Sequence, residues 1–100
     1  MGSGIGDRAA GETGLITVRY WAAARSAAGV ATDQIEVSGA LSLGEVVRRA
    51  AALHPETRLP DVLPICSVLV GDRPVSAADP DDVPVEPGSQ VEFLPPFAGG

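Results

Sequence analysis

The last six residues offer the clearest chemistry in this chain, because they present a C-terminal carboxylate with little around it. They read Pro95-Pro96-Phe97-Ala98-Gly99-Gly100. Gly99 and Gly100 have no side chains, so the carboxylate can pass through a channel that would exclude a bulkier terminus. Pro95 and Pro96 have fixed φ angles and lack a backbone N–H, which favours an extended exit from the preceding structure. Six extended residues reach about 20 Å, enough to enter the active site of a partner.

The other reactive side chains are better explained as structural or solvated groups. Cys66 lies in an apolar run without a His or basic neighbour to lower its pKa, so we predict an unreactive core residue. His54 ends a predicted helix, where the helix dipole favours a surface position. A single cysteine and a single histidine do not make a metal site, and the acidic loop at 79–82 lacks the spacing of a calcium loop. We therefore expect no metal and no permanently bound cofactor.

The charge balance argues against two kinds of partner. Thirteen carboxylates and seven arginines give a net charge of −6, which is unfavourable for binding nucleic acid or an anionic membrane. No apolar run approaches the ~20 residues of a membrane-spanning helix. A single cysteine fits a reducing compartment, so we predict a cytoplasmic protein. The sequence contains no lysine, and its side chains therefore offer no amine that could accept an isopeptide bond.

Three segments are expected along the chain. Residues 1–14 are rich in glycine and poor in large apolar groups, which predicts a flexible N-terminal arm. Residues 15–94 form the folded domain, and residues 95–100 form the extended tail. Alternating apolar and polar residues predict strands at 15–21 and 34–38, and the segment between them is mainly a connection with room for a helical turn.

A helix is expected after these two strands. Ser42 and Glu45 have the spacing of a capping box, an apolar stripe follows, and Pro55 prevents continuation, so the helix is placed at 43–54. The next residues, 56–64, are interpreted as a surface connection with one short turn.

The rest of the domain is expected to be strand. Apolar, β-rich runs predict strands at 65–70 and 90–94, with a short edge strand at 75–76 and a Pro-Gly turn at 86–89. One long helix can cover only one face of a sheet. The predicted fold class is therefore α+β, a mixed sheet of four to five strands wrapped around one main helix, with the last strand near the middle.

Several stretches together point to a known family. They are Ile16-Thr17-Val18-Arg19-Tyr20-Trp21-Ala22, then Ala24-Arg25 and Gly29, the helix start at Leu43, the strand ending at Val70, and Phe93-Leu94-Pro95-Pro96-Phe97-Ala98-Gly99-Gly100. In these stretches the chain resembles the MoaD/ThiS family of ubiquitin-like sulfur carriers over about residues 15–100. The likeness is closest to MoaD, the small subunit of molybdopterin synthase, and the ending is its most specific part. The resemblance implies a β-grasp fold.

The resemblance also implies a carrier cycle on the tail. An ATP-using adenylyltransferase of the MoeB type would adenylate the carboxylate of Gly100, and a sulfur donor would convert it to a thiocarboxylate. A MoaE-like large subunit would take the tail into its active site and use the sulfur for the dithiolene of molybdopterin. Gly99 would share the carrier site, and the partner would contact Pro95, Pro96, Phe97 and Ala98. The chain would be a co-substrate whose task is positioning, and ATP would be used by the activating enzyme.

Three other functions stay open on the sequence alone. A sulfur carrier for thiazole (thiamine) or cysteine biosynthesis would have the same ending, and only its partner would distinguish it. A ubiquitin-like modifier would be conjugated to lysines of target proteins. A plain interaction module would use the tail without covalent chemistry.

Overall fold

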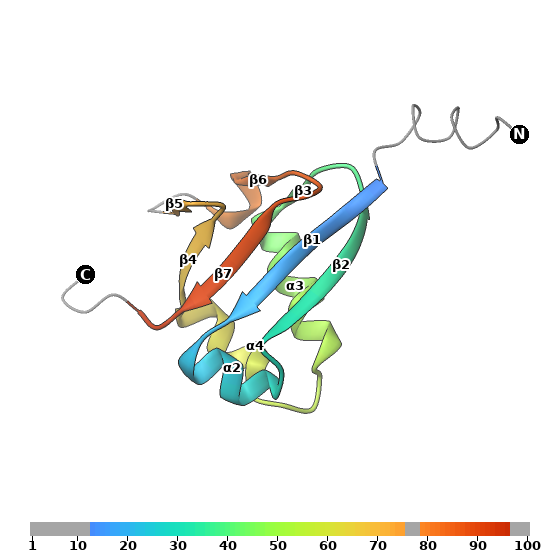
Figure 1. Ribbon diagram of the computed structural model, residues 1–100. Helices are drawn as coiled ribbons and strands as arrows, with labels where there is room; N and C mark the ends of the chain where they lie inside the picture. The colour runs from blue at the N-terminus through green and yellow to red at the C-terminus, as the bar shows by residue number, and fades with distance from the viewer. Residues whose placement is uncertain (1–12, 76–78, 97–100) are drawn as a thin grey trace, which may run out of the picture.

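The chain folds as a five-stranded mixed sheet with a long helix packed on one face (Figure 1). The computed structural model describes residues 13–75 and 79–96. The sheet has the order β2-β1-β7-β4-β5, in which β1 and β7 are parallel and the other neighbours are antiparallel. Its strands are β1 (Thr13–Tyr20), β2 (Thr32–Ser38), β4 (Ser67–Val70), β5 (Arg73–Pro74) and β7 (Gln90–Leu94). The predicted α+β, β-grasp fold is confirmed, and the last strand lies in the middle of the sheet.

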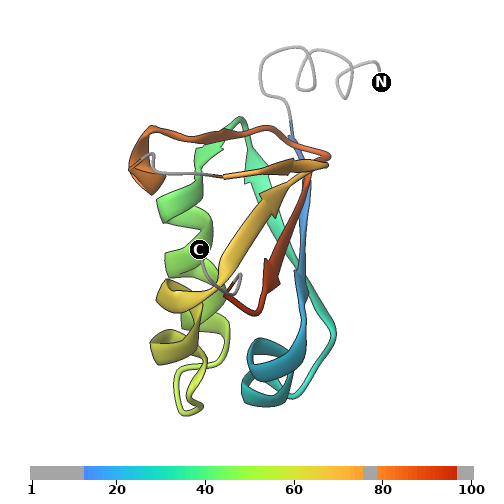
Figure 2. The same ribbon diagram turned by 90° about the vertical axis from the view of Figure 1, so that its left-hand side faces the viewer.

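The main helix, α3 (Leu43–Leu53), forms a second layer beside the sheet, to its left in the side view of Figure 2. Its start was predicted correctly: the backbone N–H of Glu45 donates to Ser42 Oγ at 3.0 Å. The Glu45 carboxylate pairs with Arg48 and Arg49 on the exposed face of the helix. The start of α3 is thus held by the Ser42 cap, which satisfies a backbone donor that has no partner within the helix.

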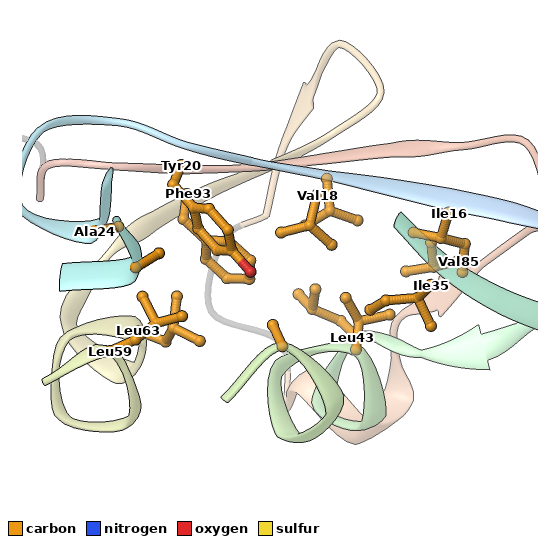
Figure 3. Packing of buried hydrophobic residues seen from close by; sticks show 14 of the residues in the cluster. Ile16, Val18, Tyr20, Ala24, Ile35, Leu43, Leu59, Leu63, Val85 and Phe93 are labelled. Carbon is orange, nitrogen blue, oxygen red and sulfur yellow. The ribbon is translucent and has the colours of Figure 1, made fainter. Parts of the chain in front are cut away.

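Mainly aliphatic side chains from the two layers fill the core (Figure 3). The alternation along β1 places Ile16, Val18 and Tyr20 on the inner face, where all three are buried. On β7, Phe93 is fully buried, and its ring stacks on that of Tyr20 with 6.2 Å between centroids. The last strand is therefore anchored in the core up to one residue before its end.

Two segments contain more helix than expected. Residues 22–28, predicted mainly as a connection, form helix α2 (Ala22–Ala28), which buries Ala24 and Ala28 and ends at Gly29 with φ of 79°. An alanine-rich segment has high helix propensity, and glycine at this φ is a common helix end. The interpretation of this segment as mainly a connection was wrong, because the helical turn that the sequence allowed extends to a seven-residue helix.

The segment predicted as a surface connection at 56–64 is also corrected. It contains α4 (Leu59–Val62) and the 3-10 helix η1 (Leu63–Ile65), and it contributes Leu59 and Leu63 to the core. The segment contains Pro60 and Pro64, and prolines are common in loops as well as at helix starts. Each lies in the first turn of its helix, where the missing N–H has no cost.

Smaller corrections concern strand bounds. Strand β1 begins at Thr13, so two residues assigned to the N-terminal arm belong to the sheet. Strand β4 begins at Ser67, and a short edge strand, β5, lies at 73–74; the predicted edge strand began at Val75, and its second residue, Ser76, lies outside the described residues. A second, two-stranded sheet pairs β3 (Leu41–Ser42) with β6 (Pro84–Val85), and the acidic loop contains the 3-10 helix η2 (Pro80–Asp82).

Candidate functional site: the tail exit

The candidate site is the point where the C-terminal segment leaves the sheet. Strand β7 ends at Leu94, and the next two residues, Pro95 and Pro96, are exposed. On one side the backbone N–H of Trp21 donates to the carbonyl oxygen of Phe93 at 3.0 Å. On the other side Ser67 is paired with Leu94. The segment therefore leaves between the end of β1 and the start of β4, while Phe97, Ala98, Gly99 and Gly100 lie outside the described residues.

Apolar side chains that are exposed to solvent flank this exit. Ile65, just before β4, is 65% exposed, and Trp21, just after β1, is 38% exposed. We call Trp21, Ile65, Leu94, Pro95 and Pro96 the exit collar. Its members come from three distant parts of the chain and are brought together by the pairing of β7 with β1 and β4. Exposed apolar groups gathered in one place are typical of an interaction surface.

The indole of Trp21 is held in place by a polar network. Its Nε1–H donates to Glu92 Oε1 at 3.0 Å, and Gln90 Nε2 donates to the other carboxylate oxygen of Glu92 at 2.8 Å. The guanidinium of Arg19 lies 5.0 Å from the centre of the indole ring, a distance typical of a cation–π contact. The aromatic member of the collar therefore has a defined position before any partner arrives.

A cluster that sequence reasoning missed lies beneath the exit. Tyr20 Oη donates to Asp33 Oδ2 at 2.9 Å, and His54 Nε2 lies 2.6 Å from the same oxygen. Burial, then the hydrogen bond to Asp33 and the charge of Asp33, raises the pKa of Tyr20 above its ordinary value. His54 is largely buried and paired, so its predicted position at the helix surface was wrong. The cluster ties together the ends of β1 and α3 and the start of β2.

The remaining candidate residues are held in contacts within the fold. Burial raises the pKa of the half-buried Cys66 thiol, which donates to the carbonyl oxygen of Val62 at 3.4 Å; a raised pKa disfavours the reactive thiolate form. Asp79 caps η2 and Asp81 pairs with Arg48 at 3.3 Å. Within 13–75 and 79–96, no group of three His, Cys, Asp or Glu side chains could hold a metal ion.

The helices in the described part of the chain are all too short or too polar to cross a lipid bilayer.

These features define a class of protein. It is a β-grasp domain whose central strand anchors a proline-stiffened C-terminal segment, with an apolar collar around the exit. A family model described as the ThiS family matches residues 18–100, and the chain belongs to that family. A comparison with curated proteins gave no match.

Solved structures share the fold. The HVO 2177 protein of Haloferax volcanii is 27% identical, with a TM-score of 0.68 and 88% of each chain covered. The small archaeal modifier protein 1 of Haloferax volcanii is 16% identical, with a TM-score of 0.68 over 84% of this chain and 99% of that chain. A chain from the complex of subunits 1 and 2 of the molybdopterin-converting factor of Helicobacter pylori is 21% identical, with a TM-score of 0.56 over 86% of this chain and 99% of that chain.

Proposed function

We propose that this ThiS-family protein is a sulfur carrier and that the carboxylate of Gly100 is the group that carries the sulfur. The single observation that supports this most is the exit itself. The end of β7 is fixed in the core by Phe93, and two exposed prolines then direct the chain outward between Trp21 and Ile65. Such an arrangement presents a narrow terminus to a partner and keeps its origin rigid.

The proposed chemistry needs no acid or base from this chain. A carboxylate is a poor electrophile, so an ATP-using activating enzyme first joins it to AMP, and pyrophosphate leaves. A sulfide equivalent from a sulfur donor then attacks the acyl carbon and displaces AMP, which leaves a thiocarboxylate on Gly100. Gly99 and Gly100 suit this task because neither adds a side chain that would block the enzyme's channel.

We further propose that the sulfur is delivered to the dithiolene of molybdopterin. The Helicobacter pylori structure contains two subunits of a molybdopterin-converting factor, and one of its chains has the fold of this protein. By analogy, a large synthase subunit would surround the exit collar and take Pro95, Pro96, Phe97 and Ala98 into its channel. The negative net charge of the chain favours a partner with a basic surface around that channel.

A ubiquitin-like modifier is the second candidate, because a small archaeal modifier protein shares the fold. In that case the activated carboxylate of Gly100 would be attacked by a lysine amine of a target protein instead of by sulfide. The two functions share the adenylation step and differ in the nucleophile that follows.

Intact mass spectrometry of the protein from its native cell tests the proposal. A sulfur carrier is expected to show a species about 16 Da heavier, the difference between a sulfur and an oxygen atom. Adding the large synthase subunit and the pterin precursor of the dithiolene should remove that species and form molybdopterin. Isopeptide-linked adducts in the lysate without the heavier species would favour the modifier, and sulfur transfer to a thiazole synthase alone would refute the molybdopterin assignment.

A further inference from the structure

A groove runs between α3 and β4. It has a volume of about 560 Å³, and its apolar lining includes Val47 of α3 and Val68 of β4. All four residues of β4 are only partly buried, whereas the inner side chains of β1 and β7 are fully or almost fully buried. The inner face of β4 is thus the part of the core that the described residues leave incompletely filled.

The tail exit opens at one end of this groove. Phe93, Ser67, Cys66 and Pro64 all line it, and Ser67 is the residue that pairs with Leu94. Pro95 therefore follows directly beside the groove lining. Consecutive Cα atoms are about 3.8 Å apart, so the side chain two residues beyond Pro95 is within reach of the groove.

We propose that the groove is the resting site of the chain's own Phe97, occupied when no partner holds the tail. Phe97 follows the two exit prolines directly and is the one large apolar side chain among residues 97–100. Its ring is matched to a site made mainly of aliphatic and proline side chains. Of the three charged side chains in the lining, Arg48 and Asp81 form a salt bridge with each other, and the apolar part of the lining suits an uncharged aromatic ring better than an ion.

This resting position has a functional consequence. With Phe97 in the groove, the chain turns back at Pro96, and the carboxylate is held near the surface of its own domain. A partner that contacts the exit collar must withdraw the ring before the tail can enter its channel. The domain and the partner thus compete for Phe97. The tail is released only when the partner's contacts with it are stronger than those that hold Phe97 in the groove.

The single cysteine provides a reporter, since Cys66 lines the groove. The rate of its alkylation by iodoacetamide would be measured in the purified full chain, in Phe97→Ser, in Phe97→Leu and in a chain that stops after Pro96. We expect Phe97→Ser and the shortened chain to react at least threefold faster than the unmodified chain. Phe97→Leu, which keeps an apolar side chain, is the matched control and should react close to the unmodified rate.

Methyl NMR gives a second and independent measurement, because alkylation can be limited by local opening. The methyl signals of Val47 and Val68 should shift on removal of residues 97–100, while those of Leu15, far along β1, should stay in place. Equal alkylation rates in the unmodified, Phe97→Ser and shortened chains, or unshifted methyl signals, would overturn the proposal. The experiment needs neither ATP nor an activating enzyme, so its failure would leave the sulfur-carrier proposal untouched.

Discussion

Replacing Ile65 by serine should weaken the binding of a partner without weakening the fold. Ile65 is 65% exposed, so its loss changes little in the folded domain, and surface changes usually alter the free energy of unfolding by less than about 0.5 kcal/mol. Burying a whole isoleucine side chain contributes about 1.5–3 kcal/mol. Because about two thirds of this side chain is still exposed, a partner that covers the exit collar can gain roughly 1–2 kcal/mol from it. We expect Kd to rise about 5- to 30-fold.

The measurement is isothermal titration of the activating enzyme or of the large synthase subunit with Ile65→Ser, together with thermal unfolding of the variant alone. Leu15→Ser is the matched control: Leu15 is 41% exposed but lies at the far end of β1 from the exit. Its affinity for the partner should stay within twofold of the unmodified protein. If Ile65→Ser binds as tightly as the unmodified protein, or if both variants lose the same affinity, the exit collar is not the docking surface.

Three further predictions test the tail, the core and the buried tyrosine. Removing Gly99 and Gly100 should abolish thiocarboxylate formation, seen by mass spectrometry, and leave the thermal unfolding midpoint nearly unchanged; a large loss of stability would show that the glycines are structural. Leu59→Ala should lower the free energy of unfolding in urea by about 2–4 kcal/mol, since Leu59 is fully buried; a loss below about 1 kcal/mol would contradict the core assignment. The free energy of unfolding should fall as pH rises above about 10. In the unfolded chain Tyr20 ionises there, whereas in the folded protein its raised pKa keeps it protonated. The same urea titrations on Tyr20→Phe should show a smaller fall, and an equal fall would contradict the role of Tyr20.

Much of the fold could be predicted because its signals are local. The alternation around Val18, the Ser42 cap and the strand before Pro95 each depend on neighbours within a few residues, and each was placed within two or three positions. Residues 59–65 were missed because prolines mark both loops and helix starts, and only burial of Leu59 separates the two. Local sequence does not report burial against elements that are distant in the chain, here α2 and α3.

The candidate site, like the fold, was only partly predictable from the sequence. The proline and glycine ending is contiguous and was visible in the sequence, whereas the exit collar depends on pairing between strands. Trp21 and Ile65 are far apart in the chain and meet the exit only because β1 and β4 both pair with β7. The cluster of Tyr20, Asp33 and His54 depends on the register of β1 with β2 and on where α3 ends. A lone histidine at a helix end gave no signal of a carboxylate 21 residues earlier.

The place of β7 in the sheet explains how this fold would position the tail of the proposed sulfur carrier. An edge strand can fray, but β7 is hydrogen-bonded on both sides, and fraying at its end would expose Phe93. Pro95 then stops the ladder, because it has no N–H to donate. The origin of the tail is therefore fixed relative to Trp21 and Ile65. A partner that docks on the exit collar always finds the start of the tail at the same position. It follows that changes to the buried residues of β7 should act mainly on stability, and changes after Leu94 mainly on transfer.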